Sequence, residues 1–384
     1  MVRRRIFLQS SITALGGALL ASCGLGSSDS SGASDSSGSS SVVDPDDTRR
    51  WLMPDEGDRH ARTWMAFVAE KDIWGRDLAP GVKRDLAGIA TAIAAFEPVS
   101  LLVPEHEMDL ARELTGTAGV DLVACELDDL WVRDTGPVFV RPVDGGEVSA
   151  GVDFNFNGWG DKQEHRSDRE VAGFVTGEAG VEHLRTDLVL EGGALEVDGE
   201  GTAIITESCV LNDNRNPGWS KQDVEEELER LLGVTTVIWL PGIAGMDITD
   251  GHTDFYARFA RPGVVVAGLE TDPDSFDYDV TRTHLDILRG ATDAAGRELQ
   301  VEVLESPSSV REEYDSEDVA AGYINFYLCN GAVIVPEFGA EDTDTAARDL
   351  LRRLFPEREV VQLNIDAIAA GGGGIHCATQ QQPA

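Results

Sequence analysis

The sequence predicts an α/β fold in which five like units form a ring. One order of elements recurs along the chain: an apolar strand, a polar loop, an amphipathic helix and a second apolar strand. The strands are short and rich in β-branched residues, and the helices carry apolar residues at the spacing of surface helices. A polar, glycine-bearing segment follows each second strand. A ring of like units would bring these segments to one end of the molecule, where they would form a single pocket.

The five units occupy residues 100–363. The first reads SLLVPEHEMDLARELTGTAGVDLVAC and the last reads AVIVPEFGAEDTDTAARDLLRRLFPEREVVQL. Both end their first strand on Val-Pro-Glu, which supports a common plan. The three units between them start near Val152, Ala203 and Val264. The polar segments that follow the units are ELDDLWVRDTGP, EGGA, PGIAGMDITDGH, ESPSS and AIAAGGGGIHC.

Residues 1–22 have the features of a lipoprotein export signal of the twin-arginine type. A run of arginines precedes an apolar stretch, residues 12–21, that is too short for a membrane-spanning helix, which needs about 20 apolar residues. LASC, ahead of Gly24, resembles a lipobox in which Cys23 becomes lipidated. The alternatives are an uncleaved anchor and an ordinary secretory peptide. We expect an exported protein, lipid-anchored on the outer face of the cytoplasmic membrane, with no other membrane contact.

Residues 23–48 are mostly Ser, Gly and Asp, and they predict a flexible tether because such a segment cannot bury a core. Residues 49–384 have an ordinary apolar content and enough length for one large core. The simplest interpretation is therefore one globular domain behind a tether.

The net charge of −38 argues against nucleic acid as a partner, because a nucleic-acid interface needs basic patches. The charge is compatible with a cationic substrate, although net charge governs solubility and steering more than specificity. Whether the acidic surface reflects salt adaptation stays open, as does the formation of a homo-oligomer.

The predicted domain contains four cysteines: Cys125, Cys209, Cys329 and Cys377. Their spacings match neither a zinc site nor a dense disulfide framework. A disulfide among the first three stays open in an oxidising compartment.

The segment DGHTDFYARF alternates like a strand, so we expect His252 and Asp254 on one face and Thr253 and Phe255 in packing. A histidine beside a carboxylate is suited to proton transfer. The alternative is a plain ion pair at a strand edge. Two further acids just upstream, Asp247 and Asp250, add negative charge.

Two other segments carry candidate site residues. WVRDTGPVFVR places Trp131 and Asp134 before a turn, where the aspartate could equally bond its own backbone and the tryptophan could belong to the core. LEGGALEV places Glu191 ahead of two glycines, where backbone can approach a ligand closely. Its alternative is an exposed acid in a hairpin.

Cys377 needs an activating setting, because a thiol attacks well only as a thiolate and cationic neighbours favour that form. His376 would face the opposite way in an extended segment, so His252 is the better partner. Residues 371–374 are glycines and would let the chain wrap around a small substrate. A cysteine, a histidine and several acids together suggest attack on a planar cationic carbon, as in a guanidinium group. A protease site would need oxyanion donors and has no use for so many acids.

Six motifs, in order, carry a family resemblance: MPDEGDRHARTWMAF, WVRDTGPVFV, EGGALEVDGEGT, LNDNRNP, DGHTDFYARF and GGGGIHCATQQQP. Over about residues 51–384 the chain resembles agmatine deiminases and the bacterial peptidylarginine deiminase family around them. The resemblance implies the five-bladed α/β propeller of guanidino-group-modifying enzymes, and neither a metal nor an organic cofactor.

The resemblance also implies roles for individual residues. Cys377 would be the nucleophile, His252 the general acid and base, and Asp134 and Asp254 the clamp on the guanidinium group. The predicted substrate-binding residues are Trp131, Glu191, Asp247, Asp250 and Gly374.

The function that follows is hydrolysis of agmatine to N-carbamoylputrescine and ammonia, through an amidino group held on the cysteine, in polyamine metabolism. One alternative is deimination of peptidyl-arginine. Another is a lipid-tethered protein that binds polyamines without catalysis, which would need the acids but not Cys377.

Overall fold

The computed structural model describes residues 41–42, 49–316 and 319–384. The predicted signal peptide, the candidate lipidation site Cys23 and most of the predicted tether lie outside the described residues. Within these ranges, no helix combines the length and the apolar character that crossing a membrane requires.

The described strands form five sheets. The strands are β1 (Ser41–Val42), β2 (Trp51–Leu52), β3 (His60–Ala66), β4 (Val99–Val103), β5 (Val120–Ala124), β6 (Val138–Pro142), β7 (Ala150–Asp153), β8 (Glu182–Arg185), β9 (Leu195–Val197), β10 (Thr202–Thr206), β11 (Thr236–Leu240), β12 (Ala257–Arg261), β13 (Val264–Leu269), β14 (Gln300–Glu305), β15 (Tyr327–Cys329), β16 (Ala332–Glu337), β17 (Glu359–Asn364) and β18 (Thr379–Pro383). Their orders are β1-β8-β7-β6-β2, β11-β10-β9, β12-β13-β14, β15-β16-β17 and β18-β3-β4-β5.

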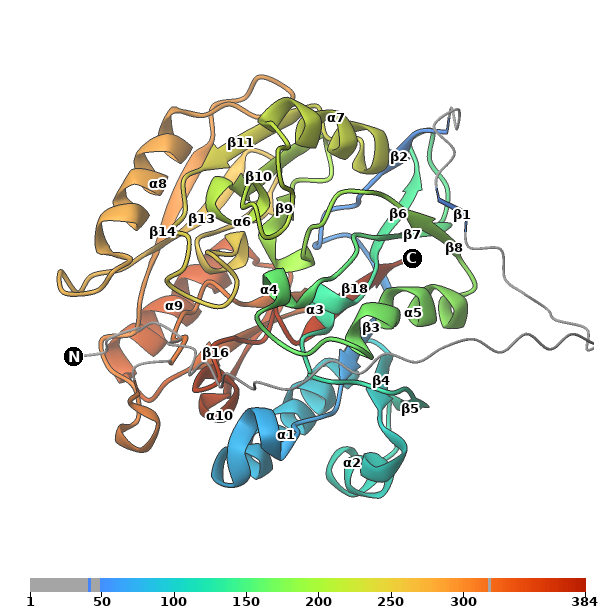
Figure 1. Cartoon of the computed structure of the whole chain (residues 1–384). Coiled ribbons are helices and arrows are strands. Elements are labelled where there is room, and N and C mark those ends of the chain that lie inside the picture. The colour runs from blue at the N-terminus through green and yellow to red at the C-terminus, as the bar shows by residue number, and fades with distance from the viewer. Residues whose placement is uncertain (1–40, 43–48, 317–318) are drawn as a thin grey trace, which may run out of the picture.

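The longer helices α1, α2, α7, α8 and α9 lie toward the outside of the molecule in Figure 1, and the short α3 and α4 lie near its middle. The α-helices are α1 (Lys71–Ala94), α2 (Met108–Thr115), α3 (Val132–Thr135), α4 (Gly158–Asp161), α5 (Val171–Ala179), α6 (Glu207–Val210), α7 (Lys221–Leu232), α8 (Tyr278–Gly290), α9 (Glu341–Leu354) and α10 (Asp366–Ala369). The 3-10 helices are η1 (Glu105–Glu107), η2 (Asp168–Glu170), η3 (Gly192–Ala194), η4 (Thr253–Phe255) and η5 (Glu312–Tyr314).

The predicted units are confirmed as strand–helix–strand elements. The paired strands are parallel in each unit: β4 with β5, β7 with β8, β10 with β11, β13 with β14, and β16 with β17. Parallel neighbours need a crossover connection, and α2, α5, α7, α8 and α9 provide it. The sequence plan missed one further unit, β3–α1–β4, whose strands are also parallel.

An antiparallel strand joins each unit directly after its polar segment. β6, β9, β12 and β15 pair with β7, β10, β13 and β16, and they follow α3, η3, η4 and the chain after η5. In the remaining sheet, β18 pairs antiparallel with β3, so the segment after Cys377 is held against the start of the domain. This pairing places the glycine run and Cys377 in the fold, next to a buried strand.

One detail of the sequence prediction is wrong. DGHTDFYARF is not a continuous strand, because Asp250 and Gly251 have φ values of 63° and 90°, which an extended chain does not adopt. Strand β12 begins only at Ala257, so His252 and Asp254 reach the site from a turn and from η4. The disulfide that the sequence left open is absent, since Cys125, Cys209 and Cys329 are free thiols.

Candidate functional site

A cavity of about 280 Å³ lies where the polar segments meet. Of the predicted site residues, Trp131, Asp134, Asp247, His252 and Cys377 line it. They come from three parts of the chain that are far apart in sequence, as the prediction of one shared pocket required. Phe255, which we expected in packing, also lines the cavity.

Cys377 lies in a turn at the inner end of the cavity, almost fully buried. Its Sγ lies 3.5 Å from Oδ2 of Asp254 and accepts a hydrogen bond from Nδ2 of Asn325 at 3.3 Å. Burial and the negative charges of Asp254 and Asp134 raise the pKa of the thiol well above its usual value. The expectation that cationic neighbours lower the pKa of Cys377 is therefore wrong. In the free protein this thiol is neutral near pH 7.

His252 lies between two acids. One ring nitrogen, Nε2, lies 3.1 Å from Oε2 of Glu191, and the other, Nδ1, lies 3.8 Å from Oδ2 of Asp134. Burial lowers the pKa of His252, but Asp134, Cys209 and Glu191 outweigh it and raise the pKa well above its usual value. The ring is therefore a cation near neutral pH and can give up a proton.

Asp134 is held on α3 by two donors. Its Oδ1 accepts from the backbone N–H of Gly193 at 3.0 Å, and its Oδ2 accepts from the indole of Trp159 at 3.0 Å. A Cβ on residue 193 would lie only 2.6 Å from Nδ1 of His252 and 2.9 Å from Oδ1 of Asp134. The second glycine of EGG is thus required by the close approach of three site residues. Burial raises the pKa of Asp134.

Asp254 is fully buried and contacts both the thiol and a histidine. Its Oδ2 lies 2.8 Å from Nδ1 of His376, whereas its Oδ1 has no hydrogen-bond partner among the described residues. Burial raises the pKa of Asp254, but the hydrogen bond and charge of His376 outweigh it, so the pKa lies below its usual value.

Comparison with known proteins identifies the family. A sequence model described as Porphyromonas-type peptidyl-arginine deiminase matches residues 52–383. The chain belongs to this deiminase family. A Streptomyces coelicolor protein provisionally named an agmatine deiminase is 46% identical over 86% of this chain and 98% of its own length. The agmatine deiminase of Pseudomonas aeruginosa is 38% identical over 86% of this chain and 95% of its own.

Solved structures agree with this assignment. The agmatine deiminase of Enterococcus faecalis superimposes with a TM-score of 0.80 at 33% identity, covering 87% of this chain and 96% of that one. The mixed α/β fold is therefore that of solved agmatine deiminases, and the resemblance read from the six motifs is confirmed.

Four of the predicted site residues lie outside the cavity lining in this deiminase: Asp254, Glu191, Asp250 and Gly374. Arg215 forms ion pairs with Glu191 and Asp250. Its Nε lies 2.8 Å from Oε1 of Glu191, and its Nη1 lies 2.7 Å from Oδ2 of Asp250. A Cβ on residue 374 would lie 2.4 Å from Oδ1 of Asn325, so this glycine makes room for a protein side chain. Sequence spacing could not show these partners.

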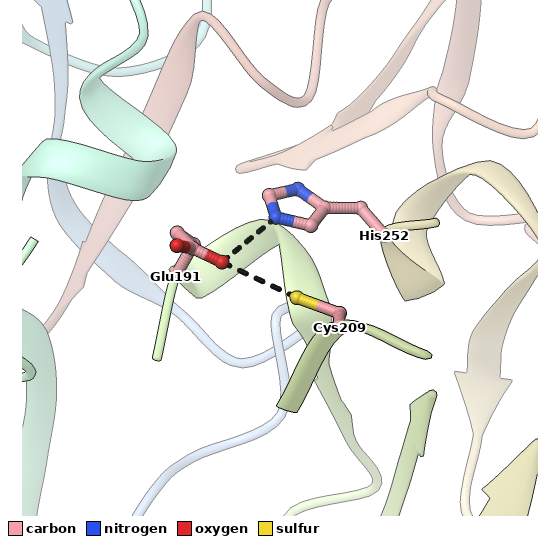
Figure 2. Close-up of side chains that lie close together, drawn as sticks. All are labelled: Glu191, Cys209 and His252. Carbon is pink, nitrogen blue, oxygen red and sulfur yellow. Dashed lines mark hydrogen bonds and ion pairs between the residues drawn. The ribbon is translucent and has the colours of Figure 1, made fainter. Parts of the chain in front are cut away.

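Glu191, Cys209 and His252 are the only buried group of the described chain whose spacing could hold a metal ion. Figure 2 shows one oxygen of Glu191 facing both the His252 ring and the Cys209 thiol. Arg215 and His252 already supply positive charge to this carboxylate. Burial raises the pKa of Cys209 to about 12, so it is a neutral thiol, a poor metal ligand. The arrangement is best explained by hydrogen bonds that orient His252.

Sequence reasoning missed four residues around the site: Glu56, Arg133, Asn325 and His376. Glu56, Arg133 and His376 stand inside quoted motifs, which was the available signal, whereas Asn325 does not. His376 does not face away from the site, because residues 375–378 form turns where we expected an extended segment. Its ring contacts Asp254, the same carboxylate that lies beside Cys377.

Proposed function

We propose that this protein is an agmatine deiminase, which hydrolyses the guanidino group of agmatine to N-carbamoylputrescine and ammonia. The family membership and the similarity to agmatine deiminases over most of both chains support the proposal. One observation of the site carries it: a neutral thiol and a cationic histidine border a cavity whose described lining contains acids but no Lys or Arg.

In the proposed mechanism the substrate activates its own nucleophile. Asp134 and Asp254 receive the guanidinium group, since charge-assisted hydrogen bonds to carboxylates are strong. The bound cation offsets the two negative charges that keep the pKa of Cys377 high, so the thiol loses its proton to water. The thiolate then attacks the guanidinium carbon and forms an S–C bond.

His252 then moves two protons. It first gives its proton to the departing nitrogen, the C–N bond breaks and ammonia leaves, with the amidino group on Sγ of Cys377. The neutral ring next takes a proton from water, whose oxygen attacks the amidino carbon. Collapse of this adduct breaks the S–C bond and restores the thiolate. The proton of its hydroxyl group passes to water as the C=O bond forms, and N-carbamoylputrescine leaves. Glu191 and Arg215 keep the ring in place.

The cavity favours a small dication over larger or anionic substrates. Its volume of about 280 Å³ is at the lower end of ligand sites. The carboxylate of free arginine would meet no Lys or Arg among the described residues of the lining. Asp247 lines the cavity and is the proposed partner of the distal ammonium group, with Trp131 as a wall.

Peptidyl-arginine is the second candidate substrate, because the matching family is described as peptidyl-arginine deiminase. A panel of agmatine, arginine and an arginine-containing protein separates the two, with ammonia release and citrulline as readouts. We expect agmatine to turn over fastest and Cys377 to carry an amidino adduct by mass spectrometry. Citrullination of the protein without turnover of agmatine would favour the second candidate, and binding of agmatine without turnover would contradict both.

We further infer that the five sheets are the blades of a five-bladed α/β propeller. Repetition of the strand–helix–strand unit supports this inference, as does the position of each polar segment just before an antiparallel strand. A crystal structure with a pseudo-fivefold axis through the cavity would test it.

For the cell, we propose export with residues 1–22 as signal peptide, a lipid on Cys23, a tether over residues 23–48 and a catalytic domain over residues 49–384. The arginine run, the short apolar stretch and LASC support the proposal. Cys23→Ala should move the protein from the membrane fraction to the soluble fraction. Unchanged fractionation would contradict the lipid anchor, and sedimentation of the purified chain would report any homo-oligomer.

A further inference from the structure

His376 lies between two carboxylates and precedes Cys377, a residue of the cavity lining. Its Nδ1 lies 2.8 Å from Oδ2 of Asp254, and its Nε2 lies 2.8 Å from Oε2 of Glu56. Ionised carboxylates only accept hydrogen bonds, so each ring nitrogen must carry a proton and donate it. The ring is therefore held by a hydrogen bond at each end, and it is almost completely buried.

Glu56 is the fixed end of this arrangement. Its Oε1 accepts from Nη2 of Arg258 at 2.7 Å and from the backbone N–H of Leu328 at 2.9 Å. Its Oε2 also accepts from Nη2 of Arg133 at 3.2 Å. Burial raises the pKa of Glu56, but Arg258 and His376 outweigh it and hold the pKa well below its usual value. A carboxylate bonded from several directions cannot turn, so it fixes the direction of the His376 ring.

Asp254 is the functional end. Its Oδ2 accepts the hydrogen bond from Nδ1 of His376 and lies 3.5 Å from Sγ of Cys377, whereas its Oδ1 is buried without a partner in the described chain. A buried carboxylate oxygen without a donor is costly, so such an atom calls for an explanation. A planar cation bound beside Cys377 would supply the missing N–H.

We propose that His376, anchored by Glu56, is a positioning residue for guanidinium binding. Its hydrogen bond to Oδ2 of Asp254 keeps that acid ionised. The other oxygen, Oδ1, is then the acceptor for an N–H of the substrate. The inference rests on the proposed function, since it concerns how the deiminase holds its substrate. A purely structural histidine would affect stability and leave substrate affinity unchanged.

Two isosteric variants separate the two hydrogen bonds of the ring. The amide nitrogen of Asn occupies the place of Nδ1 and keeps the bond to Asp254, whereas that of Gln occupies the place of Nε2 and keeps only the bond to Glu56. Both are made in the Cys377→Ser protein, and the Kd for agmatine is measured by calorimetry. We expect His376→Gln to raise the Kd at least about tenfold. The increase in Kd caused by His376→Asn should be smaller than that by a factor of at least about three.

His60 provides a matched control. It is also buried, with Nδ1 3.0 Å from Oε1 of Glu97 and Nε2 2.8 Å from the backbone oxygen of Glu56, but it does not contact Asp254. His60→Asn and His60→Gln should lower the unfolding temperature and leave the Kd for agmatine unchanged. In the active chain, His376→Gln should likewise raise KM by a larger factor than it lowers kcat.

Equal effects of His376→Asn and His376→Gln on the Kd, or no effect of either, would overturn the inference while agmatine turnover by the wild-type chain upheld the proposed function. A wild-type chain that neither binds nor turns over agmatine would overturn both. If His376→Gln does not fold, Glu56→Gln gives the same test, because the ring then loses its anchor and the Kd should rise. An unchanged Kd in folded Glu56→Gln would contradict the proposal.

Discussion

Two groups of buried acids lie side by side in this protein and have opposite partners. The reaction end consists of Asp134 and Asp254 with His252 and Cys377. The support layer consists of Glu56, Glu191 and Asp250 with the arginines Arg133, Arg215 and Arg258. Every acid of the support layer contacts an arginine. No Lys or Arg of the described chain forms an ion pair with Asp134 or Asp254.

The pKa values of Glu191 and Asp134 follow this difference, whereas in Asp254 the hydrogen bond and charge of His376 lower the pKa. Arg215 and His252 outweigh burial and lower the pKa of Glu191 to about 2, whereas burial raises the pKa of Asp134. A buried carboxylate that has its own guanidinium group is part of the structure. The reaction end resembles the same ion pairs with the arginine left out, so a substrate guanidinium can take that place. An acidic cavity without Lys or Arg in its described lining is therefore expected to select a planar cation.

The largest expected effect tests the nucleophile of the reaction end. Cys377→Ser should lower kcat for agmatine by about 10⁴-fold or more, because a serine hydroxyl stays neutral even with the cation bound. Steady-state ammonia release measures it, with Cys125→Ser, a thiol outside the cavity, as control. Retention of most of the activity would show that the thiol does not carry the reaction.

The next effect tests the support layer. Arg215→Met leaves Glu191 and Asp250 buried without their guanidinium partner and should lower the free energy of unfolding by about 3–5 kcal/mol. Urea unfolding measures this change. Lys221→Gln removes an exposed ion pair with Glu207 and should change the free energy by less than about 1 kcal/mol. Similar values for both variants would mean that the arginine is not what stabilises these acids.

A third variant compares the two groups directly. Asp134→Asn should weaken agmatine binding by about 1.5–3 kcal/mol, because one charge-assisted hydrogen bond to the substrate is lost. Asp250→Asn, in the support layer, should lower the unfolding temperature and leave the affinity nearly unchanged. Calorimetry in the Cys377→Ser protein and thermal unfolding give the two readouts. The comparison fails if Asp250→Asn weakens binding as much as Asp134→Asn.

The smallest expected effect is a shift on the pH axis. The raised pKa of Cys377 means that its thiolate appears only as the pH rises above 9, so alkylation of the free protein by iodoacetamide should be slow at pH 7. Asp134→Asn removes one negative charge, which lowers the thiol pKa and moves the rise in rate to lower pH. Both proteins carry Cys125→Ser. Burial raises the pKa of that half-buried thiol to about 11, so without this change its own alkylation at high pH would add to the signal. Identical pH profiles would contradict the proposed role of the carboxylate charge.

The sequence predicted the repeating units because their information is local. The alternation of strands and helices depends on apolar spacing within each segment, and all five strand pairs were found where it placed them. The further unit β3–α1–β4 was missed. Its sheet is completed by β18 from the other end of the domain. No local pattern reports such a pairing.

The site was predicted in part for the same reason. Motifs identified Asp134, His252, Asp254 and Cys377 by residue type, and the structure brings them to one place. Glu191 and Asp250 are also acids beside glycines in the sequence. They lie outside the cavity lining, however, and both form ion pairs with Arg215. Only distances between remote residues distinguish an acid that meets an internal arginine from one that does not.

By itself, the sequence determined the strand–helix–strand units, the acidic character of the pocket and the thiol that ends the last polar segment. The tertiary structure decided the protonation states, since the pKa values of Cys377 and His252 depend on burial and on charges supplied by other segments. It also decided the position of His376, because turns at residues 375–378 rotate its ring toward Asp254. Electrostatic interactions act through space between segments far apart in the chain, so their outcome is set only when the chain has folded.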